Sequence, residues 1–157
     1  MATAVTYDEW LRLPEVRDAR SLLGHFDEDQ FSLAAAPFGL VIRKEPLTVR
    51  VPDLAVSEMA TIIEQDGFIH SPPQLVAEVL APGEDLNRKL ADYASLGVPE
   101  VWVVSSEART VEVLTWKNGR LHVAQTLSHG AFTSPHYPQV TVSVEGLWTH
   151  WRPQQVE

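Results

Sequence analysis

The chain has 157 residues, a net charge of −9, 45% hydrophobic residues and no cysteine. A chain of this length and hydrophobic content buries a core of its own, so we expect a single globular domain over residues 1–157. The composition excludes disulfides and thiolate metal sites, and the negative charge disfavours broad, non-specific binding of nucleic acid. No run of about 18 apolar residues and no secretory signal pattern is present, so we expect a cytoplasmic protein with no membrane partner.

The first part of the chain predicts short helices. Thr6 and Glu9 form a capping box, in which the two side chains satisfy free amides at the start of a helix. The apolar residues within 16–23 suit one or two further helical turns. The acidic residues 27–29 favour another helix start, because negative charge is stabilising there, and we expect a short helix over residues 31–34.

From Phe38 onward the pattern changes to strands. Two apolar runs, 40–42 and 47–49, flank a turn at residues 44–46, which predicts a hairpin. Residues 51–56 follow as a further strand, with Pro52 at its start or at an edge of the sheet. Residues 58–65 then predict a short helix.

The middle of the chain predicts a strand, a helix and a second strand. Residues 75–80 are apolar except for Glu78, which is typical of a strand buried on both faces. A helix from about residue 85 to residue 96 is expected to end at Gly97, the residue type that most readily follows a helix in the left-handed conformation. Residues 100–104 predict another buried strand.

The last third predicts a hairpin and a short end. Residues 110–116 and 121–126 alternate apolar and polar side chains around an Asn-Gly pair at 118–119, the strongest local hairpin signal. Residues 139–144 predict a final strand, and residues 146–151 a terminal helical turn. The whole order predicts an α+β fold with a central mixed β-sheet flanked by helices and a β-hairpin towards the C-terminus.

Glu78 is the first candidate functional residue. An unpaired carboxylate in a buried strand would cost several kcal/mol, so a compensating charge is expected. At roughly 100° per residue, Lys89 lies on the apolar face of the following helix with Leu86, Leu90 and Tyr93. The alternatives are a lysine that reaches solvent along the margin of the helix, and a purely structural ion pair, which stabilises little.

Asp53 adds a second carboxylate and favours a functional interpretation. Two neighbouring carboxylates repel and raise each other's pKa unless a cation lies between them. Mg²⁺ takes one or two carboxylates together with carbonyl oxygens and water, and a nearby lysine can orient a nucleophile or stabilise the charge on a phosphoryl group. Asp53, Glu78 and Lys89 therefore predict a site for hydrolysis of phosphodiester bonds.

The same residues carry a family resemblance. The PD-(D/E)XK nuclease pattern is resembled by Pro52-Asp53, Glu78-Val79-Leu80 and Lys89. The amino-acid sequence from Gly39 to Trp148 resembles the Uma-two-type restriction endonuclease family. The resemblance implies a restriction-endonuclease-like fold and a nucleic acid substrate, which we expect to be DNA, although the sequence does not distinguish DNA from RNA. It also implies Mg²⁺ or Mn²⁺ held by Asp53, Glu78 and the carbonyl of Val79, and Lys89 as the catalytic lysine.

The chain departs from that pattern at several positions. Two residues after Glu78, where the superfamily has its catalytic lysine, the chain has Leu80. Lys89 on the next helix would supply this lysine instead, as the helix does in the Uma-two-type family. Ala81, Val101 and Ser105 replace the family's Ser, Tyr and Asp. The family's early acid-bearing strand and its long first helix, which often contributes a further active-site acid, are expected to be shortened or absent between Pro14 and Pro37. Two alternatives to the nuclease stay open: a catalytically degenerate interaction module of the same fold, and a metal phosphoesterase for small substrates.

The sequence also predicts how the protein binds nucleic acid and a second copy of itself. An acidic chain can bind nucleic acid only through a local basic cluster, for which the candidates are Arg43, Lys44, Arg50 and Arg88. A homodimer is expected, because nucleases that cut both strands commonly present two sites by two-fold symmetry. Its contact would use the hairpin at 118–119 or the C-terminal tail, and their tryptophans are Trp116, Trp148 and Trp151.

The histidines carry no predicted chemistry. Their spacing matches no metal-ligand pattern, so we expect ordinary surface or core roles for all six: His25, His70, His122, His129, His136 and His150.

Overall fold

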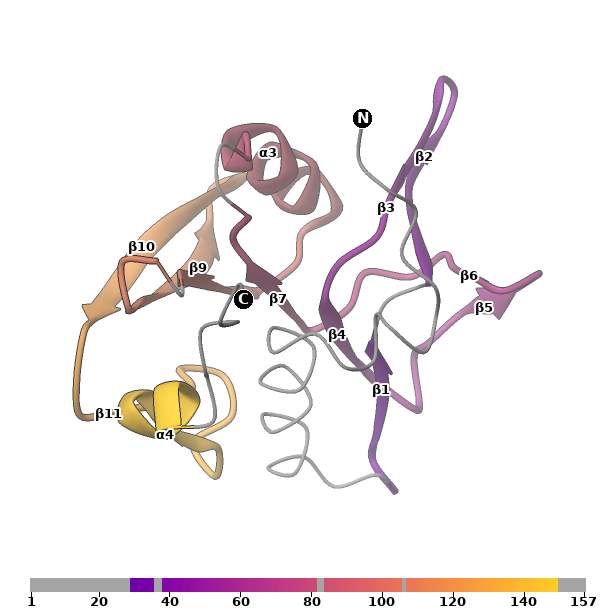
Figure 1. The fold of residues 1–157 in the computed structure, drawn as a ribbon. Coiled ribbons are helices and arrows are strands. Elements are labelled where there is room, and N and C mark those ends of the chain that lie inside the picture. Colours follow the sequence, from indigo (N-terminus) through magenta and orange to yellow (C-terminus); the bar gives the residue numbers. More distant parts are fainter. Residues whose placement is uncertain (1–28, 36–37, 82–83, 106, 150–157) are drawn as a thin grey trace, which may run out of the picture.

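A six-stranded mixed sheet forms the centre of the computed structural model, which describes residues 29–35, 38–81, 84–105 and 107–149 (Figure 1). In this sheet β7 and β8 run parallel, and the other neighbouring strands run antiparallel. The expected mixed sheet and α+β class are therefore confirmed. In spatial order the strands are β1 (Phe31–Ala35), β4 (Leu54–Glu58), β7 (Leu75–Val79), β8 (Glu100–Ser105), β9 (Thr110–Lys117) and β10 (Arg120–Leu127).

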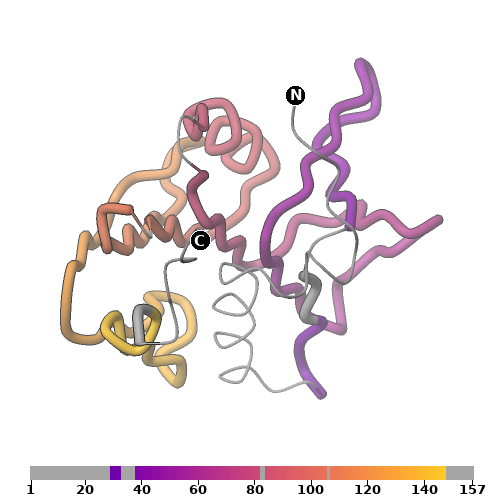
Figure 2. The backbone as a smooth tube through the Cα atoms, in the orientation of Figure 1, coloured from indigo at the N-terminus to yellow at the C-terminus, as the bar shows by residue number. Residues whose placement is uncertain are grey.

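Two smaller sheets and two helices complete the described part of the chain. Four short strands make the second sheet, in the order β3 (Leu47–Arg50), β2 (Gly39–Lys44), β6 (Phe68–Ile69) and β5 (Glu64–Gln65). The third sheet pairs β11 (Ala131–Thr133) with β12 (Thr141–Ser143), and the helices are α3 (Leu86–Leu96) and α4 (Val144–Thr149). The backbone path in Figure 2 shows the β2–β3 hairpin projecting from the rest of the chain as a narrow arm.

The central sheet is buried on both faces, because successive side chains of a strand point to opposite sides. On β7, Leu75 and Ala77 pack into a core that β11, β12 and α4 cover from one side. Val76, between them, packs into a second core with Tyr93 of α3. Glu78 follows the same alternation as Val76, so the strand directs it towards α3.

Capping residues fix the start and the end of α3, the helix that connects β7 to β8. The side chain of Asp85 accepts a hydrogen bond from the amide of Asn87 and so caps the start of the helix. Gly97 ends it in the left-handed conformation (φ 76°), as predicted, and leads the chain into β8. The predicted strand–helix–strand unit is confirmed, and no helix in the described ranges has the length and apolar character that a membrane span needs.

The structure corrects two predicted helices. Residues 31–34 belong to β1, because they pair with the otherwise open edge of β4, and Phe31 enters the core. Residues 58–65 end β4, turn, and begin β5. The sequence signal against a helix over residues 58–65 is the Asp66-Gly67 pair that follows it. Both residues have positive φ and connect the two strands of the β5–β6 hairpin, a position that Asp-Gly pairs favour.

The hairpins are found where the sequence predicts them. Asn118 and Gly119 take positive φ (52° and 78°) between β9 and β10, the geometry that a two-residue hairpin turn needs. The β2–β3 hairpin is also confirmed. The final helix begins at Val144, two residues before the predicted turn. The helices predicted around Thr6 and residues 16–23 lie outside the described residues.

Candidate active site

Strand register brings Asp53 to Glu78. In the antiparallel β4–β7 pair, Leu54 lies opposite Ala77 and Ala55 opposite Val76. One residue further along this register, Asp53 lies opposite Glu78. The Asp53 carboxylate accepts a hydrogen bond of 2.7 Å from the amide of Val79, which anchors it at the end of β7. Two acids that are far apart in sequence therefore meet at one end of two neighbouring strands.

The Glu78 carboxylate is buried and is held from α3. Its residue is 2% exposed, and the Tyr93 hydroxyl donates a short hydrogen bond to Oε1. Lys89 donates to the other oxygen, Oε2, at 3.4 Å. The predicted approach of Lys89 to Glu78 is thus present in the structure, and the alternative of a lysine that extends wholly into solvent does not describe it, since its side chain is 22% exposed.

Lys89 has a second partner that the sequence analysis missed. Its ammonium makes a closer ion pair with Glu84, whose other oxygen accepts a hydrogen bond from the amide of Ala81 at 3.1 Å. These acids raise the pKa of Lys89 above its ordinary value, against the lowering effect of partial burial. The hydrogen bond from Lys89 lowers the pKa of Glu84, although partial burial acts in the opposite direction. Lys89 therefore stays charged between two carboxylates.

The pKa of Glu78 is raised to about 7, mainly by burial and then by the negative charge of Asp53. The hydrogen bond from Tyr93 and the charge of Lys89 oppose this shift. Burial also raises the pKa of Asp53, against the hydrogen bonds to Val79 and Glu78. The two carboxyl groups thus interact directly, and the negative charge of Asp53 disfavours ionisation of Glu78, as expected for two acids with no cation between them.

A divalent ion fits this donor set. No cluster of three or more His, Cys, Asp or Glu side chains that could hold a metal ion is found among the described residues. Asp53 and Glu78 offer two carboxylates, and Val79, which follows Glu78 and donates its amide to Asp53, carries the carbonyl that the sequence predicts as the main-chain ligand. One or two carboxylates with carbonyl oxygens and water are the usual set for Mg²⁺.

The predicted basic cluster is only partly assembled. Arg43 and Arg50, from the β2–β3 hairpin, both pair with Asp92 of α3, at 3.4 Å and 2.6 Å. These ion pairs fasten the hairpin to the helix that carries Lys89. Lys44 and Arg88 are exposed.

Another buried acid, Glu100, lies on the other face of the sheet. Glu100 begins β8 and is 0% exposed. It accepts hydrogen bonds from the indole of Trp102 (2.6 Å), the hydroxyl of Ser134 (2.8 and 2.9 Å) and the amide of His136 (3.1 Å), and the His136 ring lies 3.0 Å away. His136, given no role from the sequence, thus helps to hold the β11–β12 segment on the sheet.

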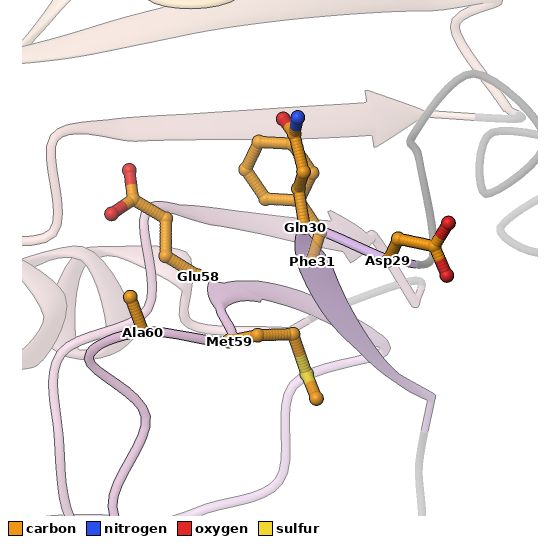
Figure 3. Close-up of a pocket in the computed structure, with 6 residues that line it drawn as sticks. All are labelled: Asp29, Gln30, Phe31, Glu58, Met59 and Ala60. Carbon is orange, nitrogen blue, oxygen red and sulfur yellow. The ribbon is translucent and has the colours of Figure 1, made fainter.

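One pocket of the described residues lies away from the acids of the site. It has a volume of about 410 Å³ and lies where β1 meets the end of β4 (Figure 3). The carboxylates of Asp29 and Glu58 stand at opposite ends of it in Figure 3, with Met59 below, so it does not form a second acidic site. Its lining residues are Asp29, Gln30, Phe31, Glu58, Met59 and Ala60.

Tyr93 and Glu84 are the site neighbours that sequence reasoning missed. The signal for Tyr93 was its position one helical turn after Lys89, on the same face, where it was assigned only to the core. Glu84 precedes the helix and gave no periodic signal. Its distance of five residues from Lys89 becomes contact only through the turn that leads into α3.

Comparisons with known proteins identify the family and the fold of the chain. A family model described as "Uma2: Putative restriction endonuclease" matches residues 17–148. This match begins before Gly39, the first residue of the family resemblance described in the sequence analysis. The crystal structure of a putative nuclease belonging to DUF820 from Anabaena variabilis is similar in fold, with a TM-score of 0.66 and 13% identity. That similarity covers 86% of this chain and 76% of the other. No curated protein matches the chain.

Proposed function

Because the chain belongs to the Uma2 family of putative restriction endonucleases, we propose that it is a Mg²⁺- or Mn²⁺-dependent endonuclease that hydrolyses phosphodiester bonds of DNA. The observation that carries this proposal is the pair of buried, interacting carboxylates of Asp53 and Glu78 beside the charged Lys89. A structural ion pair would need one acid for one lysine, whereas here Lys89 is shared between Glu78 and Glu84, and Asp53 adds to the negative charge.

Each residue has a distinct role in the proposal. Asp53, Glu78 and the carbonyl of Val79 would hold the ion, which when bound supplies positive charge to the phosphoryl group. Lys89 would orient the attacking water and stabilise the negative charge that develops on the phosphoryl oxygens. Its raised pKa keeps it protonated, so it acts as a cation and hydrogen-bond donor rather than as a base.

Calorimetric titration with Mn²⁺, combined with cleavage of plasmid DNA, tests the proposal. Asp53→Asn and Glu78→Gln should abolish both Mn²⁺ binding and cleavage. Lys89→Met should lower cleavage by about 10²–10³-fold, the usual loss for one charge-stabilising donor, and leave Mn²⁺ binding within a few-fold. Glu64→Gln, at an exposed acid of β5, is the matched control and should change neither. Undiminished Mn²⁺ binding in both carboxylate variants would rule out the site.

A small phosphodiester is the second candidate substrate, and one observation favours it. The chain carries a net charge of −9, and Arg43 and Arg50 are occupied by Asp92 rather than directed to a polyanion. Hydrolysis of bis(p-nitrophenyl) phosphate without cleavage of plasmid or single-stranded DNA would select this candidate over the endonuclease.

We also propose that the protein is a homodimer. On the β9–β10 hairpin, the side chains of Trp116 and Val123 are 42% and 54% exposed, which supplies apolar surface for a contact between copies. The two-fold symmetry of such a contact would present two sites to the two strands of a duplex.

A further inference from the structure

Tyr93 is completely buried, yet its hydroxyl is directed to a charged group. The residue is 0% exposed and packs among apolar side chains between α3 and the central sheet. Its hydroxyl donates to Oε1 of Glu78. A phenylalanine would fill the same apolar space, so core packing alone does not account for the hydroxyl.

The two donors on Glu78 come from one face of one helix. Lys89 and Tyr93 are four residues apart on α3, which places them one above the other. Tyr93 donates to Oε1 and Lys89 to Oε2, so each carboxylate oxygen has its own donor. Because every carboxylate oxygen has more than one lone pair, each oxygen keeps acceptor capacity for a cation.

Tyr93 is the donor in this contact, and an ionised carboxylate accepts hydrogen bonds only. A metal also needs the ligand in its ionised form, so the hydroxyl and a cation would use the same form of Glu78.

We propose that Tyr93 is a positioning residue of the metal site, whose hydroxyl fixes the orientation of the Glu78 carboxylate for a divalent cation. The proposal rests on the proposed function, in which Glu78 is a metal ligand. Tyr93 does not touch the substrate in this role. It acts through Glu78, in the manner of outer partners that orient a ligand and whose loss lowers metal affinity by about 10–100-fold.

Tyr93→Phe, which removes only the hydroxyl, is the test variant, and Tyr137→Phe is the matched control. Tyr137 belongs to the opposite core, and its ring lies edge-on to Phe31 at 5.3 Å. Calorimetry should show Mn²⁺ binding weakened by about 10–100-fold in Tyr93→Phe and unchanged within twofold in Tyr137→Phe. The electron paramagnetic resonance spectrum of bound Mn²⁺ should change in the first variant only, since it reports the arrangement of the ligands. Urea unfolding of both variants shows that each is folded.

A second measurement uses the unaltered protein. The chain has three tyrosines, so labelling with ¹³Cζ-tyrosine gives three signals, and Tyr7→Phe and Tyr137→Phe assign two of them. Addition of Mg²⁺ should shift the remaining signal, from Tyr93, because its hydrogen-bond acceptor becomes a ligand. This measurement decides the matter even if Tyr93→Phe does not fold.

The outcomes separate the two proposals. Mn²⁺ binding that is unchanged in a folded Tyr93→Phe variant, or a Tyr93 signal that Mg²⁺ does not move, overturns the role of Tyr93 and leaves the metal site in place. An unaltered protein that binds neither ion overturns the proposed function and the role of Tyr93 with it.

Discussion

Glu78 and Glu100 lie on neighbouring parallel strands of one sheet, and both are almost completely buried, with 2% and 0% exposure. They stand at opposite ends of the strand pair and, by the alternation of side chains, on opposite faces. Glu100 is surrounded by donors from Trp102, Ser134 and His136. Glu78 has two donors and a second acid, Asp53, beside it.

The difference teaches that burial alone does not mark a functional acid. A buried carboxylate that is fully supplied with hydrogen bonds is a structural element, because its charge is already stabilised. A buried carboxylate that lies beside another acid is less well stabilised: burial, and then the charge of Asp53, raise the pKa of Glu78 to about 7 although Tyr93 and Lys89 oppose the shift. The supply of donors, rather than depth in the fold, distinguishes the candidate site from the structural contact.

The largest effect is expected for removal of the structural acid. Glu100→Ala leaves the buried donors of Trp102 and Ser134 without their acceptor, and should lower the free energy of unfolding by about 3–5 kcal/mol. Urea denaturation measures this, with the exposed Glu64→Ala as control. A loss below about 1 kcal/mol would mean that Glu100 is not structural, and the contrast with Glu78 would disappear.

The next effect is the pH dependence that Glu78 gives to the metal-free protein. Folding raises its pKa from 4.5 to about 7, so the folded state favours the protonated acid. The resulting stability is fully present below pH 4.5 and is lost as the pH rises through 7, by about 3 kcal/mol in total. Urea denaturation in EDTA from pH 5 to pH 8 should show this fall, and Glu78→Gln should remove most of it. Equal slopes in the two proteins would contradict the assignment.

The smallest effect on the structure of the single chain is expected from substitutions at the proposed dimer contact, which should change only the oligomeric state. Trp116→Ser combined with Val123→Ser should convert a dimer to a monomer in sedimentation velocity at micromolar concentration, since a stable contact buries on the order of 1,200 Å² or more. The pH dependence from Glu78 should stay the same, because that site is built within one chain. An unaltered protein that already sediments as a monomer would contradict the dimer.

The sequence predicts the local parts of this fold well. The Asn118-Gly119 turn, the Gly97 helix end and the alternation in β9 are encoded by neighbouring residues. Residues 31–34 are predicted as a helix but belong to a strand, because the pairing of β1 with β4, 19 to 27 residues away, has no local signal. Tertiary pairing overrides local preference in such a segment.

The contacts of the candidate site also divide into those that neighbouring residues encode and those that depend on the tertiary structure. The meeting of Glu78 and Lys89 follows from a strand, a turn and a helical face, which a sequence displays. The donor from Tyr93 and the second partner Glu84 depend on the rotation of α3 and on the path of the turn before it. The contacts of Glu100 with Ser134 and His136 join residues 34 and 36 positions apart and could not be predicted from spacing.

These separations have an entropic consequence for the connection through α3. Glu78 meets Lys89 after 11 residues, whereas Glu100 meets the amide of His136 after 36. The entropy lost on closing a loop grows with the logarithm of its length, so the longer closure costs about 1 kcal/mol more than the shorter one. The structural acid therefore obtains its donors from Ser134 and His136 only after a long stretch of chain has been ordered. The acid of the candidate site obtains its lysine from the adjacent helix at a smaller cost in chain entropy.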